Sequence, residues 1–288
     1  MFKSVAALVS IVGLALCAAS TAHANVTKEE VLAAPNDWRE VAPEDLIIMK
    51  TTKGDVVIEI APGFSPQHCD QVRRIVRSGL YAGTLFHRVI NDFMAQGGDI
   101  DRAHNEPSGQ PNIPAEFVFR RSPSDMPIDA ISNTPEGGKV LAGYYKGFPL
   151  LSRPEAQSDF TFDGKVESWM PHCAGVTSMA RTDDPNSAND QFFLMRAETE
   201  FLNRKYTSWG RMLQGLDVAK ALNVGEPPSQ PDMVISAVVA ADIIPDKRPR
   251  AWVMRTDSAA FNAIVNQQDE GTAICDMPDV PSLVEFPQ

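Results

Sequence analysis

The sequence predicts a mainly β protein built around a closed antiparallel barrel that two helices cap. Three observations predict this class: short strand-like segments recur along the chain, turn residues separate them, and only two stretches have a clear helical spacing of apolar residues. The chain has 288 residues, of which 43% are hydrophobic and 22% charged, so it can bury a sizeable core.

The charge balance excludes several classes of partner. The formal net charge is -11, and Lys and Arg residues do not cluster anywhere along the chain. Modules that bind nucleic acid or anionic membranes need basic patches. We therefore expect no nucleic-acid partner.

The first 24 residues have the features of an export signal. Lys3 gives a positive start, the stretch 5–18 is nearly all apolar, and Ala22 and Ala24 are small residues at the positions that signal peptidase reads. The alternative is an uncleaved membrane anchor, but the apolar run is shorter than the roughly 20 residues that span a bilayer. We expect cleavage between Ala24 and Asn25, and a monomeric, periplasmic or secreted protein without stable membrane insertion.

The mature chain begins with a lead-in and a β-hairpin. Residues 25–44 mix Pro, Asp and Glu around a short helical possibility at 27–33, and we interpret them as solvated. From 46–49 the chain becomes apolar, a Lys-Gly turn signal follows at 53–54, and apolar and polar residues then alternate over 55–60. This pattern predicts the hairpin that opens the core.

A helix of about four turns is expected next. Ser65 is its expected N-cap, Pro66 suits the first helical position, and Gly79 ends it. The apolar residues that share one face are Cys69, Val72, Ile75 and Val76.

The rest of the core consists of short strand-like segments and a second helix. That helix is expected at 215–222, where Leu216, Ala219 and Leu222 are spaced three apart. The strand-like segments are 84–90, 93–96, 117–119, 175–180, 191–195, 206–213 and 233–244.

Two stretches look like additions to a smaller core. Residues 122–170 are rich in Pro, Ser, Asp and Gly and are too long for an ordinary connection. Residues 245–288 follow the last expected strand and are rich in Pro, Asp and Glu. We interpret the first as an insertion and the second as a C-terminal extension.

Three cysteines remain after removal of the signal, so one disulfide and one free thiol are expected in an oxidising compartment. Cys173 and Cys275 lie at the edges of the added segments, and we predict that they pair while Cys69 stays buried on the first helix. Because Cys69 and Cys173 each follow a histidine, a metal site is an alternative, but no ligand spacing supports it. We expect neither a metal nor a cofactor.

Three segments concentrate the residues suited to chemistry: LFHRVINDFMAQGGD at 85–99, SMARTDDPNSANDQFFL at 178–194 and TEFLNRKYTSWGRML at 199–213. If the first contains a regular strand, Phe86 and Arg88 share one face and His87 takes the other. The strand thus places an arginine beside aromatic residues.

These segments, in this order, resemble the cyclophilin family of peptidyl-prolyl cis-trans isomerases (EC 5.2.1.8), and the second is similar to the exported bacterial branch. The resemblance covers about 45–121 and 171–244, and it implies a domain over 45–244 with eight barrel strands that the insertion interrupts. It also implies proline-containing polypeptides as substrates and assistance to the folding of exported proteins.

The resemblance assigns site residues by position. It makes Arg88 the catalytic arginine, supported by Gln96. The implied substrate-binding residues are Phe93, Met94, Ala180, Arg181, Gln191, Phe193, Phe201, Leu202 and Tyr206. Phe201 stands where many eukaryotic members have tryptophan, and Tyr206 where many have histidine, although a tyrosine hydroxyl still donates and accepts hydrogen bonds.

Alternatives remain for these residues. An arginine such as Arg88, taken alone, is more often a surface ion-pair residue, and Phe93, Met94 and Phe193 are by default core residues. Asp183, Asp184 and Asp190 are interpreted as turn residues, with a carboxylate or calcium site as the alternative. The added segments and the two departures also allow a second function, a proline-segment binding or scaffold module with weak or no isomerase activity.

Overall fold

The computed structural model describes residues 26–133, 140–269 and 271–287. Its largest element is an eight-stranded antiparallel sheet in the order β14-β2-β3-β13-β11-β12-β5-β4. These strands are β2 (Leu46–Thr51), β3 (Gly54–Ile60), β4 (Arg88–Val89), β5 (Met94–Gly97), β11 (Val176–Met179), β12 (Phe192–Met195), β13 (Ser208–Gln214) and β14 (Val234–Val239). The expected mainly β, eight-stranded architecture is confirmed.

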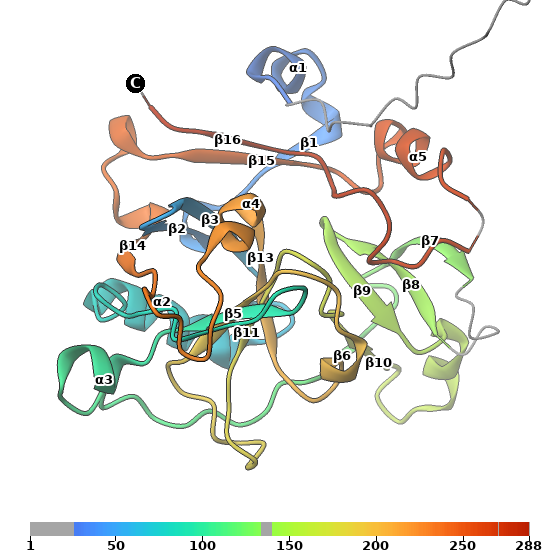
Figure 1. Cartoon of the computed structure of the whole chain (residues 1–288). Helices are drawn as coiled ribbons and strands as arrows, with labels where there is room; N and C mark the ends of the chain where they lie inside the picture. Colours follow the sequence, from blue (N-terminus) through green and yellow to red (C-terminus); the bar gives the residue numbers. More distant parts are fainter. Residues whose placement is uncertain (1–25, 134–139, 270, 288) are drawn as a thin grey trace, which may run out of the picture.

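The segment that precedes β4 closes the sheet by pairing with the residues just before β14, the strand that lies beside β2 in Figure 1. There, Leu85 pairs with Met233, and the Phe86 N–H donates to the carbonyl of Asp232 at 2.9 Å. The expected strand 84–90 is nevertheless regular only at β4, because residues around Phe86 leave the ladder. The segment expected at 233–244 is also shorter than predicted, since β14 ends at Val239 and passes into the 3-10 turn η5 (Ala240–Asp242).

Two of the helices are those that the spacing predicts. They are α2 (Pro66–Ser78), which packs on β13 and β14, and α4 (Leu216–Ala221), which packs on β3. The predicted face of α2 is buried, and Gly79 ends the helix in the left-handed conformation with φ of 74°. Ser65 holds the N-cap position, but its hydroxyl donates to the carbonyl of Ser208 instead of capping the helix.

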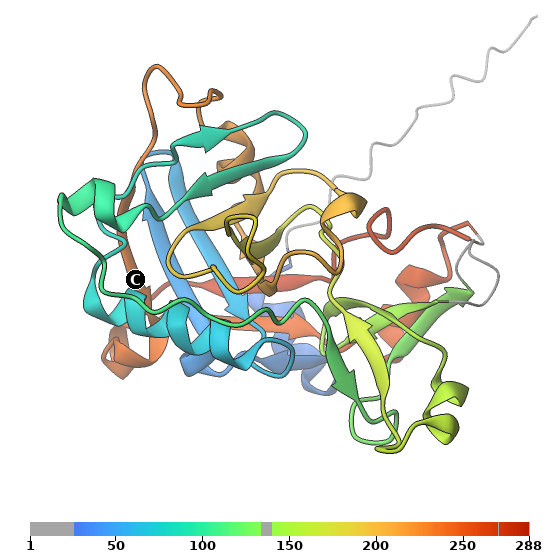
Figure 2. The same ribbon diagram turned by 90° about the horizontal axis from the view of Figure 1, so that it is seen from below.

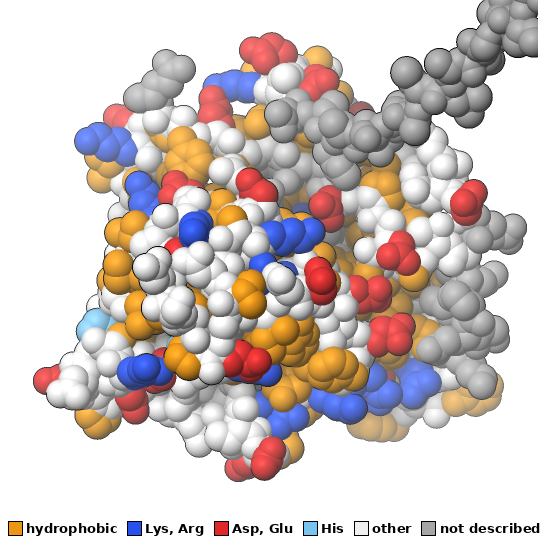
Figure 3. All heavy atoms as spheres, in the orientation of Figure 1, with side chains coloured by type: hydrophobic (Ala, Val, Ile, Leu, Met, Phe, Trp, Pro, Cys, Tyr) orange, Lys and Arg blue, Asp and Glu red, His pale blue; other side chains and the backbone are white. Residues whose placement is uncertain are grey.

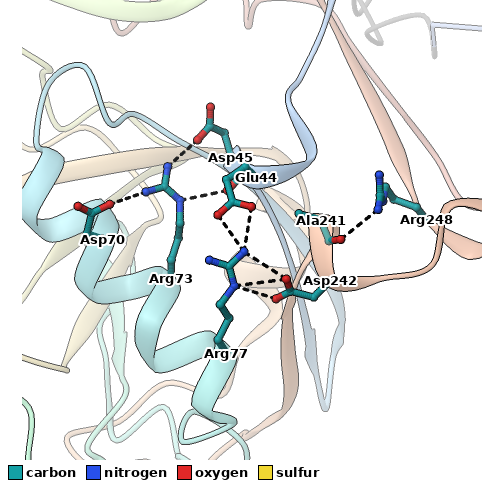
Figure 4. A network of polar contacts seen from close by, with 8 residues as sticks. All are labelled: Glu44, Asp45, Asp70, Arg73, Arg77, Ala241, Asp242 and Arg248. Carbon is teal, nitrogen blue, oxygen red and sulfur yellow. Dashed lines mark hydrogen bonds and ion pairs between the residues drawn. The ribbon is translucent and has the colours of Figure 1, made fainter.

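A polar network holds the outer face of α2 (Figure 4). Arg73 bonds Asp45 and Asp70, while Arg77 bonds Glu44 and Asp242. Glu44 and Asp45 belong to the short 3-10 turn η2 (Pro43–Asp45) that leads into β2. The network thus ties the helix to the turns before the first barrel strand and after the last one.

The insertion forms a second, five-stranded sheet in the order β6-β10-β9-β8-β7, beside the barrel (Figure 2). Its strands are β6 (Phe119–Arg121), β7 (Asp129–Asn133), β8 (Leu141–Tyr145), β9 (Phe148–Ser152) and β10 (Val166–Trp169), with the 3-10 turn η3 (Glu155–Phe160) between the last two. The segment expected at 117–119 belongs to this sheet instead of the barrel. Phe64 joins the two sheets, because its ring stacks on Phe119 at 4.6 Å and meets the edge of Phe148 at 5.4 Å.

The lead-in and the C-terminal extension together form a third, three-stranded sheet. Its strands are β1 (Trp38–Glu40), β15 (Arg250–Met254) and β16 (Ser282–Glu285), in the order β1-β15-β16. The short helices nearby are α1 (Lys28–Ala33), with Thr27 in a capping box, and α5 (Ala259–Val265). The expectation of a solvated lead-in is wrong, because Val31, Trp38 and Val41 are buried.

The remaining short elements are α3 (Ile100–His104) and three 3-10 turns, η1 (Pro35–Asp37), η4 (Glu200–Leu202) and η6 (Pro245–Lys247). One apolar core is continuous across the barrel, the insertion and the extension. Phe193 of the barrel, Phe148 of the insertion and Phe261 of the extension all belong to it. The additions are therefore packed onto the barrel.

The disulfide between Cys173 and Cys275 is present as predicted, and it joins the start of the barrel segment after the insertion to the extension. Cys69 is a buried free thiol, also as predicted, and burial raises its pKa to about 12. This thiol is therefore unreactive at neutral pH.

Within the described ranges, no helix is long and apolar enough to cross a membrane. Over the same residues, no group of three His, Cys, Asp or Glu side chains is placed to hold a metal ion. The export signal expected at 1–24 lies outside the described residues. On the face drawn in Figure 3, acidic, basic and apolar side chains are interspersed, so the net charge does not gather into one patch there.

Candidate active site

Arg88 lies on β4, at the edge of the barrel where the closing segment ends. Its side chain is 40% exposed, whereas Phe86 is fully buried together with Val89. The expectation that Arg88 and Phe86 share a face is therefore wrong, because the irregular backbone before β4 shifts the alternation. Arg88 instead faces Phe93, with its guanidinium carbon 5.9 Å from the ring centroid.

An apolar cluster of side chains lies beside this arginine. Met94 is contributed by β5, Phe193 by β12 and Leu202 by η4, and all three are buried. Phe93 is half-buried and packs against the same core. The alternative interpretation of Met94 and Phe193 as core residues is confirmed, because both side chains are buried in the core of the barrel.

Phe201 lies next to Phe93 at the outer side of this apolar cluster. Its ring lies 5.7 Å from that of Phe93, and it is 63% exposed although it is a large apolar residue. An exposed ring that adjoins a half-buried one offers an apolar surface to a ligand. The position of Phe201 on η4 therefore suits contact with a bound ligand.

Gln96 and Gln191 meet at the centre of the site. The Gln96 side-chain amide donates to Oε1 of Gln191 at 2.9 Å, and the Ala180 N–H donates to the carbonyl of Gln191 at 2.8 Å. Gln96 is also opposite Arg88 in the ladder between β4 and β5. Among the described residues, the polar partner of the Gln96 amide is Gln191 and not the arginine.

The far side of the site is built from stacked rings and a second arginine. Tyr206 meets the edge of Phe193 at 5.9 Å, and the guanidinium of Arg181 lies 4.4 Å from the Tyr206 ring. Arg181 is held by its own bond to the carbonyl of Lys205. The predicted site residues are thus brought together on one side of the barrel.

His172 lies against Phe193, whereas the sequence raised it only as a neighbour of Cys173 in the alternative of a metal site. It is 1% exposed and stacks on Phe193, with ring centroids 6.1 Å apart. Its Nδ1 donates to the side-chain oxygen of Asn203, and burial lowers its pKa to about 4. The neutral imidazole therefore supports the ring of Phe193.

Arg196 is a second supporting residue that the sequence did not reveal. It is 6% exposed, and its guanidinium donates to the carbonyls of Ile90 and Lys220 and to the side-chain oxygen of Asn91. Its backbone N–H also donates to the carbonyl of Phe93. Arg196 thus fixes the turn between β4 and β5 on which Phe93 is carried.

Glu226 is a third residue that contacts the site and was not predicted from the sequence. Its Oε2 accepts a bond of 2.7 Å from Nε of Arg88, although the two residues are 138 positions apart in the chain. A local sequence motif contains no information about such a distant pair. The only signal in the sequence is the presence of Gly225 next to a carboxylate, and it is too weak to predict the contact.

The acidic turn residues have mostly structural roles. Oδ1 of Asp184 accepts a bond from the backbone of Asn186, as expected of a turn residue. Asp190 precedes Gln191 and is 5% exposed, and burial together with the charge of Asp101 raises the pKa of its carboxyl to about 6.

Comparisons with known proteins identify the fold and the site. Residues 46–239 match the family described as "Cyclophilin type peptidyl-prolyl cis-trans isomerase/CLD". The chain belongs to the cyclophilin family and is a cyclophilin-type peptidyl-prolyl cis-trans isomerase.

Two curated relatives and one solved structure illustrate the similarity. The "Probable peptidyl-prolyl cis-trans isomerase" of Brucella abortus (strain 2308) is 32% identical over 205 residues, which is 69% of this chain and 85% of that protein. Human "Peptidyl-prolyl cis-trans isomerase-like 1" is 29% identical over 196 residues, 68% of this chain and 87% of that protein.

The crystal structure of cyclophilin AquaCyp293 from Hirschia baltica is 50% identical, with a TM-score of 0.89. The match covers 92% of this chain and 99% of the AquaCyp293 chain. The part left unmatched is smaller than either the insertion or the extension, so both additions have counterparts there, at least in part.

Proposed function

We propose that this cyclophilin accelerates rotation about X-Pro peptide bonds in exported polypeptides, and that Arg88 acts on the prolyl nitrogen. One observation carries the proposal: a half-exposed guanidinium faces the half-buried ring of Phe93, which packs on the apolar cluster that contains Met94, Phe193 and Leu202. We propose that a proline ring packs against this apolar surface, which brings the bond before it within reach of the arginine.

The chemistry of the reaction suits these residue types. Rotation about the X-Pro bond meets a barrier of about 18–20 kcal/mol because amide resonance is lost. In the twisted transition state the prolyl nitrogen gains a lone pair, so a donor aimed at it stabilises that state more than the planar one. A guanidinium supplies this donor and keeps its charge at any working pH. No covalent intermediate is needed.

The polar residues of the site position the substrate backbone. The side-chain amides of Gln96 and Gln191 bond to each other beside the apolar cluster. Ala180 and Arg181 directly follow the end of strand β11. We propose that these groups bind the peptide on either side of the proline, with Phe201 and Tyr206 forming the outer wall. Displacement of water by these rings strengthens the electrostatic action of Arg88.

We further propose that the substrates are exported proteins. The Cys173–Cys275 disulfide supports this, because such bonds persist in oxidising compartments, and the sequence of residues 1–24 has the features of a signal peptide. Mass spectrometry of the protein from periplasmic or culture fractions is expected to find a chain that begins at Asn25. Retention of residues 1–24 on the cellular protein would contradict the proposed location.

The catalytic role of Arg88 is tested by Arg88→Ala in a proline-containing tetrapeptide assay. We expect kcat/KM to fall by about a hundredfold, as for loss of one preorganised donor. Arg77→Ala is the matched control, because Arg77 is 39% exposed, also ion-paired, and lies on α2, which carries none of the predicted site residues (Figure 4). The proposal fails if Arg88→Ala keeps more than half of the wild-type rate with an unchanged circular dichroism spectrum.

A second function, binding of client chains by the additions, is favoured by one specific observation. Phe160 and Phe162 on the insertion are 90% and 101% exposed. A Phe160→Ser, Phe162→Ser double variant is expected to keep tetrapeptide turnover while losing suppression of aggregation of an unfolded client. Equal suppression by the wild type and the double variant would exclude this function.

A further inference from the structure

We propose that Glu226 is a positioning residue for Arg88, which turns the guanidinium so that its outer nitrogens face the substrate. The proposal rests on the proposed role of Arg88 in the reaction. It concerns one contact, the 2.7 Å bond from Nε of Arg88 to Oε2 of Glu226.

The position of this contact on the guanidinium matters. An arginine has five N–H donors in a rigid plane, one on Nε and four on the outer nitrogens. The carboxylate of Glu226 takes the inner donor, so it fixes rotation of the plane and leaves the outer donors available. The ring of Phe93, 5.9 Å from the guanidinium carbon, restricts the same plane from another direction.

The loop that carries Glu226 is itself fixed against β4. Gly225 and Val89 exchange two backbone hydrogen bonds, each of 2.9 Å, so the neighbours Arg88 and Glu226 are held side by side. At the root of the loop, the carboxylate of Asp232 accepts bonds from the Asn223 N–H and the Thr52 hydroxyl, both at 2.7 Å. Asp232 is 6% exposed, so this anchor is buried.

The shape of the loop requires glycine at the position before Glu226. Gly225 has φ of 154°, and a Cβ there would lie 2.5 Å from Cα of Pro228 and 2.8 Å from the carbonyl oxygen of Pro227. Both are backbone atoms, which cannot move aside as a flexible side chain does. The course of the chain at Glu226 is thus specified by the residue next to it.

The contact is poorly suited to a purely structural role. The side chains of Arg88 and Glu226 are 40% and 54% exposed, and ion pairs this open to solvent contribute little to folding. Orientation of a reacting group, in contrast, is sensitive to small displacements. Loss of the contact is therefore expected to affect turnover much more than stability.

The test compares Glu226→Ala and Glu226→Gln with the wild type in the tetrapeptide assay. We expect kcat to fall by about tenfold in Glu226→Ala with KM changed by less than about twofold, because only the orientation of the donor in the transition state is lost. Glu226→Gln keeps an acceptor oxygen for Nε and is expected to recover part of kcat. The midpoint of urea unfolding is expected to stay unchanged in both.

Asp242→Ala is the matched control. Asp242 accepts a 3.0 Å bond from Nε of Arg77, and the two side chains are 44% and 39% exposed, so an ion pair of the same kind is removed away from the site (Figure 4). Its kcat and KM are expected to equal those of the wild type. A kcat for Glu226→Ala within twofold of the wild type, or a rise in KM alone, would overturn the proposal.

A spectroscopic measurement separates this inference from the proposed function. If the wild type shows no turnover, the proposed function fails, and the ¹⁵N-edited signal of the Arg88 Nε–H then decides the positioning role. We expect slow exchange of this proton in the wild type and fast exchange in Glu226→Ala. Identical exchange in the two proteins would overturn the inference whatever the activity is.

Discussion

Acidification is expected to destabilise the protein through His172. The folded state holds this imidazole neutral with a pKa of about 4, because burial opposes its charge, whereas the unfolded chain binds a proton near pH 6.5. Above pH 6.5 neither state is protonated and the full stability is present. As the pH falls from 6.5 to 4, the unfolded state gains the proton first, so the stability from His172 is progressively lost.

The size of this effect follows from the two pKa values. Since each tenfold change in proton affinity corresponds to about 1.4 kcal/mol, the free energy of unfolding is expected to lose about 3 kcal/mol across this range. Asp190 acts in the opposite direction, because its raised pKa of about 6 lets the folded state bind a proton before the unfolded chain does. The pH dependence of unfolding measured on the wild type alone would therefore understate the contribution of His172.

A difference measurement isolates the histidine. Urea unfolding of the wild type and of His172→Gln is followed at fixed ionic strength from pH 7.5 to pH 4, and the contributions of Asp190 and the other carboxyls cancel in the difference. We expect the stability advantage of the wild type over His172→Gln to shrink by about 3 kcal/mol toward pH 4. A difference that stays constant within about 0.5 kcal/mol, the usual precision of such comparisons, would refute the reasoning.

Two further predictions concern the supports of the site. Arg196→Met is expected to lower the free energy of unfolding by about 3 kcal/mol, because the three hydrogen bonds of a buried guanidinium are lost, and urea unfolding measures it. A loss below about 1 kcal/mol would contradict this. Cys275→Ser is expected to cost about 2–5 kcal/mol, because residues 102 positions apart lose their link. Thiol titration of the unfolded, unreduced wild type is expected to find one free thiol, and three would exclude the disulfide.

The elements that the sequence predicted are those with strong local signals. Alternation over 55–60 specified β3, and Pro66 with Gly79 delimited α2 within one residue. The hairpin of β8 and β9 was missed because the Pro- and Ser-rich segments around it suggested a loop. Its turn signal was nevertheless present, since Lys146 and Gly147 have φ of 52° and 85°, a conformation that suits tight hairpins.

Long-range contacts explain what could not be predicted in the fold and the site. β1 was assigned to a solvated lead-in because its partner, β15, lies more than two hundred residues further along the chain. The three sequence segments located Arg88 and the apolar residues beside it. Glu226, Arg196 and His172, in contrast, reach the site through tertiary packing. The error in the face of Phe86 arose because alternation holds only for regular strands.

The pairing of β1 with β15 also sets an order of events for a newly made chain. Glu40 pairs with Trp252, so β1 has no partner until almost the whole polypeptide has emerged. At synthesis rates of about 5–20 residues per second, this leaves β1 with an open edge for about 10–40 s. During that interval the ring of Trp38 lacks Trp252, the residue that it packs against in the folded protein, and β1 presents an unpaired strand edge. The third sheet is thus completed only after nearly the whole chain has been made.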